Sequence, residues 1–165
     1  MRHTISVLVE NEFGVLSRVS GLFSGRGFNI ESLSVAPTLD ASISRMTIVT
    51  SGDEQILEQI TKQLNKLIDT IKIIDFTGQD YVERELALIK VSAEEATRAE
   101  VLRIVDIFRA KVVDVTPRSY TIEITGAPAK IGALVELLRP MGLKELGRSG
   151  PVVLGRGAKG WRSGE

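Results

Sequence analysis

The feature of this sequence that most constrains its fold is an order of strand-like and helix-like patterns that occurs twice along the chain. In the first half, residues 3–10 read as a strand, and the apolar positions that follow have the spacing of one helical face. Residues 27–37 and 44–51 then read as the two strands of a hairpin. A helix over residues 53–68 and a strand over residues 70–76 complete the order β-α-β-β-α-β.

The second half repeats this order after the polar segment TGQDYVE. Residues 85–92 read as a strand, and an apolar helical stripe follows between Val101 and Phe108. Residues 111–126 predict a hairpin, and residues 128–140 predict a helix with a proline near each end, where proline is tolerated. The last strand falls within residues 144–153.

The two halves also resemble each other in sequence, where SRMTIVTSGDEQI corresponds to RSYTIEITGAPAKI. This correspondence pairs Thr47 with Thr121, Ile48 with Ile122, and Gly52 with Gly126. We therefore predict an α+β protein built from two tandem ferredoxin-like βαββαβ domains, each with an antiparallel sheet and two helices on one face.

The expected domain boundaries follow from these patterns. Residues 1–77 form the first domain, residues 78–84 a linker or hinge, and residues 85–157 the second domain. Residues 158–165 are glycine-rich and basic, and we expect a mobile tail, although Trp161 within it is also a candidate anchor on a partner.

Composition excludes several classes of function. Lys and Arg number 21, as do Asp and Glu, so no broad positive field favours nucleic acid or a membrane as the partner. Cysteine is absent and His3 is the only histidine, so we expect no metal site and no thiolate chemistry. The N-terminus lacks the apolar core of a signal peptide and no apolar run is long enough to cross a membrane, which predicts a cytoplasmic protein.

The two copies differ at the entrance to their first helix. Matching Phe23 with Phe108 places Gly14 opposite Ala99 and Asn11 opposite Ala96, so the second copy lacks the Asn-x-x-Gly entrance. Asparagine is a good helix cap and glycine a common turn residue, so an ordinary turn remains an alternative. The asymmetry between the copies favours a functional role.

A helix entrance of this kind suits a small amino acid. Unpaired N–H groups at a helix N-terminus attract a carboxylate, and Gly14 lets that carboxylate approach the backbone closely. The amide of Asn11 can bond to either charged group of an amino acid. Asn29, next to the apolar Ile30, adds polar groups and a hydrophobic wall.

Three other classes are less well supported by the residues. An RNA-recognition domain shares the β-α-β-β-α-β order, but its third strand should carry stacking aromatics, and only Tyr120 is present. A hydrolytic or transfer enzyme needs a nucleophile with a base, paired carboxylates or a metal, and Ser17, Ser20 and Ser24 have no histidine near them in sequence. The SGRG and GRG segments lack the remaining residues of a phosphate-binding loop. We therefore predict no catalytic residues.

Four segments resemble the regulatory small subunits of acetolactate synthase (acetohydroxyacid synthase), and the first half resembles an ACT domain, a module that senses amino acids. These segments are SVLVENEFGVLSRVSGLFSGRGFNIESLSVAPT, SRMTIV, DVTPRSYTIEITG and RSGPVVLGRG, which together extend from Ser6 to Gly157. The resemblance implies a non-catalytic subunit that activates a catalytic large subunit and confers feedback inhibition by a branched-chain amino acid, usually valine.

The resemblance also implies a homodimer that binds the effector between two ACT domains. Carried over to this sequence, Asn11, Gly14, Val15 and Leu16 come from one chain, and Asn29 and Ile30 come from its partner. Thiamine diphosphate, Mg²⁺ and FAD are expected in the catalytic partner, with no cofactor in this chain. The alternative is an ACT-type sensor that acts on a different enzyme.

Overall fold

The computed structural model describes residues 1–161 and divides the chain into two compact units. The first unit contains Met1–Val82 together with the segment from Val153 onward, and the second contains Glu83–Val152. Each unit has its own buried core. The expected fold class, two tandem βαββαβ domains, is confirmed in both.

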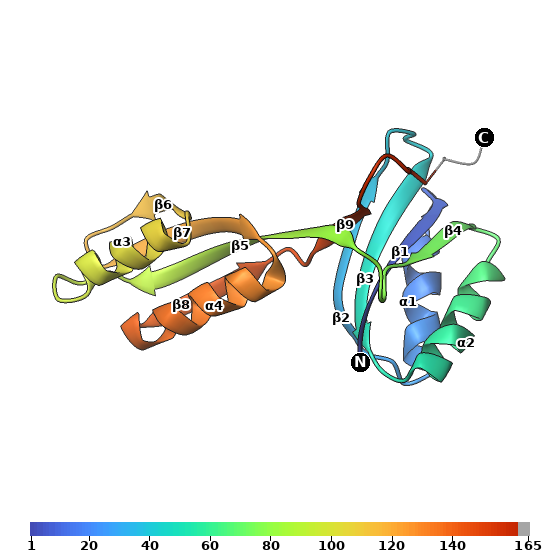
Figure 1. The fold of residues 1–165 in the computed structure, drawn as a ribbon, viewed down its shortest axis with the longest axis horizontal. Helices are drawn as coiled ribbons and strands as arrows, with labels where there is room; N and C mark the ends of the chain where they lie inside the picture. Colours follow the sequence, from blue (N-terminus) through green and yellow to red (C-terminus); the bar gives the residue numbers. More distant parts are fainter. Residues whose placement is uncertain (162–165) are drawn as a thin grey trace. The chain divides into compact units, whose positions relative to one another are not determined.

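The first unit is a four-stranded antiparallel sheet with two helices on one face (Figure 1). Its strands lie in the order β2-β3-β1-β4, so β2 and β4 are the edges. The elements of this unit are β1 (Arg2–Glu10), α1 (Val15–Gly25), β2 (Ile30–Pro37), β3 (Ile43–Ser51), α2 (Glu54–Asn65) and β4 (Thr70–Asp75).

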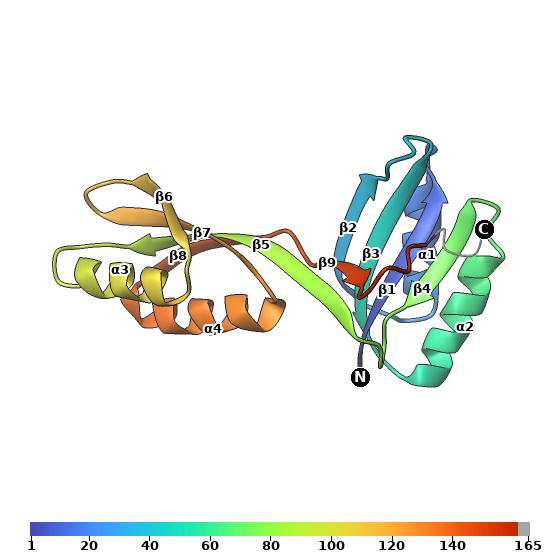
Figure 2. The same cartoon turned by 45° about the horizontal axis from the view of Figure 1, so that its top comes forward.

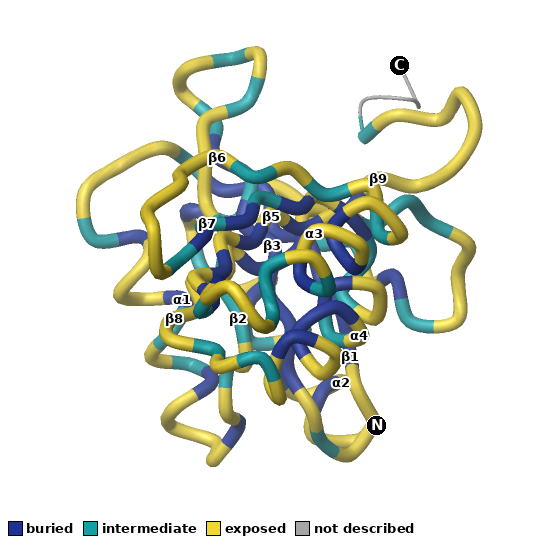
Figure 3. The backbone as a smooth tube through the Cα atoms, turned by 90° about the vertical axis from the view of Figure 1, so that its left-hand side faces the viewer, coloured by how far each residue is buried: buried dark blue, intermediate teal, exposed yellow. Residues whose placement is uncertain are grey.

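The core of the first unit lies between its sheet and its helices. Ile5, Val7 and Val9 alternate along β1 toward this core, and the residues between them are buried on the opposite face of the sheet. Val15, Val19 and Phe23 supply the matching stripe of α1; Figure 3 shows buried residues on the strands and helices and mostly exposed loops. The apolar periodicity of the sequence therefore corresponds to burial in this unit.

Glycine shapes the exit from α1. Gly27 has φ of +73°, and the N–H of Phe28 donates to the carbonyl of Phe23 at 2.9 Å, a bond that closes the end of a helix. This turn returns Phe28 to the core, where it is 7% exposed. It also fixes where β2 begins, two residues later.

The second unit repeats the arrangement with the strand order β6-β7-β5-β8, and β9 pairs with β5. Its core contains Ile89, Ile122 and Leu134, all fully buried. Its elements are β5 (Tyr81–Ser92), α3 (Arg98–Ile107), β6 (Lys111–Val115), β7 (Ser119–Gly126), α4 (Pro128–Leu138), a 3₁₀ turn (Arg139–Met141) and β8 (Leu143–Arg148). Strand β9 (Val152–Gly155) begins at the last residue of this unit and continues into the first unit.

The units differ from the boundaries expected from sequence. Strand β5 begins at Tyr81, inside the expected linker over residues 78–84, and the units divide after Val82. Val153 and the residues that follow belong to the first unit rather than to a second domain ending at 157. These boundaries depend on strand pairing and packing between residues far apart in the sequence, which local patterns do not reveal. Residues 162–165 of the expected tail lie outside the described residues.

The structure also corrects the alignment of the two copies. Both first helices end with the same backbone bond, from Phe28 to Phe23 in one and from Ala110 to Val105 in the other, each at 2.9 Å. Phe23 therefore corresponds to Val105, not to Phe108. This shift places Gly14 opposite Ala96 instead of Ala99, and Asn11 opposite Ala93. The second copy lacks the Asn-x-x-Gly entrance in either alignment.

No helix in the described residues has the length and apolar character needed to cross a membrane.

Candidate functional site

The start of α1 has no side-chain cap. Gly14 precedes the helix with φ of +82°, in the left-handed region that favours glycine. The first turn has no acidic residue. Within residues 1–161, no group accepts a hydrogen bond from the N–H of Leu16 or of Ser17. This end of the helix therefore offers two free donors to an anion.

The helix that follows in the same unit is closed by its own residues. The side chain of Asp53 accepts a hydrogen bond from the N–H of Gln55 at 2.7 Å, and Glu54 adds a negative charge to the first turn. In the second copy, Glu100 lies in the first turn of α3. An acidic residue therefore lies in the first turn of α2 and of α3, whereas the first turns of α1 and α4 have none.

Arg18 adds a positive charge beside Gly14. Its Nη1 lies 3.1 Å from the position that a Cβ on Gly14 would occupy. Its Nε and Nη2 lie 2.9 Å and 2.8 Å from Oδ2 of Asp69, which is 6% exposed. The ion pair fixes the guanidinium next to the helix start, where a second carboxylate can approach its free nitrogen.

The sequence analysis did not identify Arg18 or Asp69. Arg18 lies four residues after Gly14, and the spacing i, i+4 places two residues on the same helical face, so a signal for Arg18 was present. Asp69 is far away in sequence, and no local pattern connects it with α1.

Asn11 has a structural role in a single chain. Its N–H donates to the carbonyl of Ser42 at 2.8 Å, and its Nδ2 donates to the carbonyl of Ala41 at 3.0 Å. These two bonds attach the loop before α1 to the loop between β2 and β3. Asn11 therefore holds the helix entrance in place, as a turn residue does, and lies on its exposed surface.

Val15 and Leu16 face in different directions. Val15 is 3% exposed and belongs to the core, so only its backbone is available to a ligand. Leu16 is 46% exposed and presents an apolar side chain at the surface beside the free N–H groups. Of the two, Leu16 is the one suited to contact an aliphatic ligand.

Asn29 and Ile30 lie at the opposite end of the same sheet. Ile30 pairs with Thr50, which pairs with His3 at the start of β1, whereas Ile43 pairs with Glu10 at its end. Seven residues separate Ile43 from Thr50, a distance of roughly 24 Å along a strand. The two predicted groups therefore do not meet within one chain.

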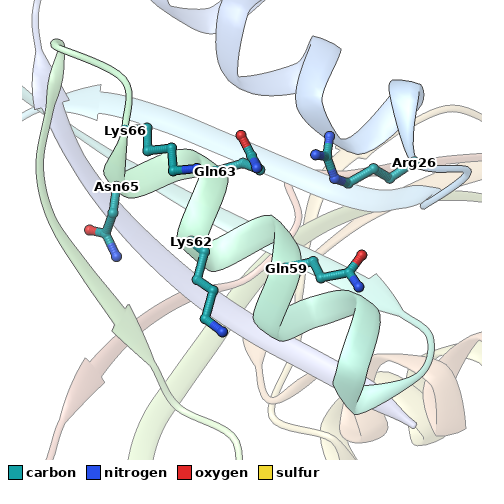
Figure 4. A pocket seen from close by; sticks show the side chains of 6 residues that line it. All are labelled: Arg26, Gln59, Lys62, Gln63, Asn65 and Lys66. Atoms are coloured by element: carbon teal, nitrogen blue, oxygen red, sulfur yellow. The ribbon is translucent and has the colours of Figure 1, made fainter.

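Another pocket in the first unit does not include any of the predicted residues (Figure 4). It has a volume of about 370 Å³, and its lining residues are Arg26, Gln59, Lys62, Gln63, Asn65 and Lys66. This lining has cations and amides but no apolar wall, so it does not suit an aliphatic amino acid. We consider the start of α1 the better candidate.

Within residues 1–161, no group of three or more histidine and acidic side chains is placed to hold a metal ion. The chemistry available at the start of α1 is therefore recognition of a carboxylate by backbone N–H groups and a guanidinium, with an apolar surface beside it.

Comparisons with known proteins match both units. A family described as "AHAS small subunit-like ACT domain" matches residues 5–72, and one described as "Small subunit of acetolactate synthase" matches residues 84–157. An acetolactate synthase small subunit from Mycolicibacterium smegmatis is 56% identical over 158 residues, which are 96% of this chain and 93% of that protein.

Two further relatives extend the comparison. A probable acetolactate synthase small subunit from Archaeoglobus fulgidus is 54% identical and is matched over 99% of its length and 96% of this chain. The crystal structure of the acetolactate synthase small subunit from Thermotoga maritima superposes with a TM-score of 0.87 at 38% identity, covering 96% of this chain and 99% of that one. The resemblance therefore includes both sequence and fold over nearly the whole chain.

Proposed function

The chain belongs to the family of acetolactate synthase small subunits, and we propose that it confers feedback inhibition by a branched-chain amino acid, valine, on a catalytic large subunit. The same chain raises the activity of that partner. Thiamine diphosphate, Mg²⁺ and FAD belong to the partner, and this chain supplies the effector site.

The observation that carries this proposal is the open start of α1. The free N–H groups of Leu16 and Ser17, the left-handed Gly14 and the nearby Nη1 of Arg18 together suit the carboxylate of a free amino acid. The exposed side chain of Leu16 suits an aliphatic side chain. One methylene changes such binding by only about 1 to 3 kcal/mol, so leucine and isoleucine are expected to bind as well.

The separation of the two predicted groups supports a site shared between chains. β2 is an edge strand and has unpaired backbone groups along its free side. If two copies pair their β2 strands antiparallel about a two-fold axis, the start of one β2 lies beside the end of the other. Ile30 of one chain then approaches the end of the sheet where α1 of its partner begins. This arrangement unites the residues that one chain keeps apart.

Inhibition follows as linkage between two sites. Valine binds one arrangement of the dimer more tightly than the other and shifts the population toward it, and the catalytic subunit responds to that shift. By reciprocity, the catalytic subunit changes the affinity for valine by the same factor that valine changes the affinity for the catalytic subunit.

Calorimetric titration of the purified chain with valine, leucine and isoleucine tests the proposal, first alone and then with the catalytic subunit. We expect saturable binding that the catalytic subunit alters. If the chain binds none of the three amino acids in either state, the effector assignment is wrong.

The shared site predicts that the chain is at least a dimer in solution and that valine strengthens the dimer, because ligand binding to an interface stabilises it. Sedimentation over a concentration series, with and without valine, measures both effects. A monomer that binds valine with the full affinity would contradict the shared site.

The absence of catalytic residues from the sequence analysis predicts that the isolated chain forms no acetolactate, even with thiamine diphosphate, Mg²⁺ and FAD added. Adding the chain to the catalytic subunit should raise the rate of product formation. Turnover by the isolated chain, once contaminating large subunit has been excluded, would overturn the regulatory assignment.

A further inference from the structure

The segment from Val153 to Trp161, called here the C-terminal strap, crosses the first unit's sheet on the face opposite to α1 and α2 (Figures 1 and 2). Two cations of the sheet donate to its backbone. Nη2 of Arg45 lies 2.9 Å from the carbonyl oxygen of Val153, and Nζ of Lys72 lies 3.0 Å from that of Trp161. The strap therefore completes a domain whose other elements lie at the opposite end of the sequence.

The strand register confirms which face the strap covers. Arg45 and Lys72 both pair with Leu8, one from each neighbouring strand, so the three residues form a row across the sheet. Their neighbour Val7 points into the core between sheet and helices, and successive residues of a strand point to opposite faces. Leu8 is nevertheless fully buried, and Val153 is 2% exposed. The strap thus removes apolar surface from water on the outer face.

Within residues 1–161, two polar groups on this face lack partners that would offset the cost of their burial. In the described part of the chain Arg45 has no carboxylate partner, and burial lowers the pKa of its guanidinium from the ordinary value. The hydroxyl of Ser6 is buried without a hydrogen-bond partner. Ser6 pairs with Thr47, so it lies on the same face as Arg45. Groups of this kind gain hydration when a cover opens, which offsets part of the apolar cost of opening.

A short path connects the strap with the candidate site. Asn11 bonds to Ala41 and Ser42, strand β3 begins at Ile43, and Arg45 is two residues further along. Anything that changes the position of the loop at Asn11 therefore acts on the strand that holds Arg45. The strap begins within β9, which pairs with β5.

We propose that the C-terminal strap is a releasable element, that Arg45 is the positioning residue that retains it, and that effector binding favours the retained state. The retained strap then transmits effector occupancy along the chain to the second unit. The part that concerns the effector rests on the function proposed above. The part that concerns release of the strap does not.

Hydrogen exchange of the full-length chain, followed at residues 152–161, tests release directly. Arg45→Glu replaces the donor with a carboxylate that repels the Val153 carbonyl, whereas Arg45→Lys keeps a positive donor. We expect exchange in the strap of Arg45→Glu to be about tenfold faster, the factor that corresponds to loss of roughly one hydrogen bond to a charged group. Arg45→Lys should remain close to the unmodified chain. Valine should slow this exchange in the unmodified chain but not in Arg45→Glu.

Inhibition assays on the complex with the catalytic subunit test the coupling. Arg45→Glu should raise the valine concentration for half-inhibition about tenfold, and by reciprocity it should also weaken valine binding to the chain whose strap it releases. Arg45→Lys, which keeps a positive donor, should keep the half-inhibition concentration close to that of the unmodified complex, a rescue that a role depending only on the packing of the arginine would not give. Circular dichroism verifies that the variant is folded.

A second variant keeps the test decisive if Arg45→Glu does not fold. Lys72→Ala with Arg156→Ala removes two exposed strap contacts, those with Trp161 and with Asp80, and should speed exchange in residues 156–161. Unchanged exchange in every folded variant overturns the releasable strap. Faster exchange with unchanged inhibition overturns the coupling. If the unmodified complex does not respond to valine, the proposed function fails, whereas the exchange data still decide whether the strap opens.

Discussion

Replacing Gly14 with aspartate should abolish inhibition by valine while leaving activation of the catalytic subunit. The new carboxylate would lie beside the free N–H groups of Leu16 and Ser17 and close to Arg18, so it would occupy the groups proposed to bind the effector's carboxylate. It would also repel that carboxylate. We expect the valine concentration for half-inhibition to rise by more than about tenfold. The measurement is activity of the reconstituted complex over a valine titration.

The backbone at Gly14 adds a cost to this substitution. Its φ of +82° disfavours side chains, and the Cβ would meet Nη1 of Arg18 at 3.1 Å. Aspartate and asparagine tolerate this region better than other residues, at roughly 1 to 2 kcal/mol. The contacted atom is the far end of a half-exposed side chain, so a shift of a few tenths of an ångström relieves the contact while the ion pair with Asp69 remains. We therefore expect the domain to remain folded, which circular dichroism tests.

Two variants separate charge from backbone strain. Gly14→Asn imposes similar strain without the negative charge, so it should reduce valine sensitivity less than Gly14→Asp does. Ala96→Asp is the matched control in the second copy, because Ala96 corresponds to Gly14 when the helix ends are aligned. It should leave inhibition intact. A folded Gly14→Asp chain that valine inhibits normally would place the effector site elsewhere.

Replacing Gly52 with alanine should destabilise the first unit and weaken effector binding. A Cβ at Gly52 would lie 2.6 Å from two ring atoms of Phe28, far inside contact distance. Phe28 is 7% exposed and immediately precedes Asn29, so the ring has little room to move and its displacement shifts the predicted site. Overpacking of this kind costs about 1 to 3 kcal/mol. Thermal unfolding should show a decrease of about 4 to 8 °C in Tm for each kcal/mol.

Gly126→Ala is the matched control, because Gly126 is the counterpart of Gly52 in the sequence repeat. Its Cβ would lie 3.0 Å from Cδ of Lys130, a flexible side chain that can turn away. The change in unfolding free energy should stay within about 0.5 kcal/mol. Equal destabilisation by both substitutions would show that the space next to Phe28 is not the reason for glycine at position 52.

The elements of the fold were predictable because each depends on a local pattern. The residues that face the core between sheet and helices recur at every second position in β1 and at every fourth position in α1, so the order β-α-β-β-α-β is visible without a structure. The open helix start at Gly14 was also visible, since it depends on which residues are missing from one short segment.

The interpretation was wrong where it required matching residues that lie far apart in the sequence. Aligning Phe23 with Phe108 by residue type shifted the two copies by three residues, and the backbone bonds that close the helices corrected it. Strand β5 begins at Tyr81, the segment from Val153 packs with the first unit, and two strands, β8 and β9, stand where one was expected. Each of these features depends on pairing between residues that are far apart in the sequence.

The sequence by itself determined the repeated fold, the family, and the uncapped glycine at the start of α1, because these follow from residues that are neighbours along the chain. Only the tertiary structure decided that Asp69 holds Arg18 beside Gly14, that Ile30 lies at the far end of the sheet, and that the C-terminal strap returns to Arg45. Each of these contacts joins residues more than 25 positions apart or depends on strand register. Such contacts form only when burial of a whole core selects one arrangement among many, so no local pattern of residues reveals them.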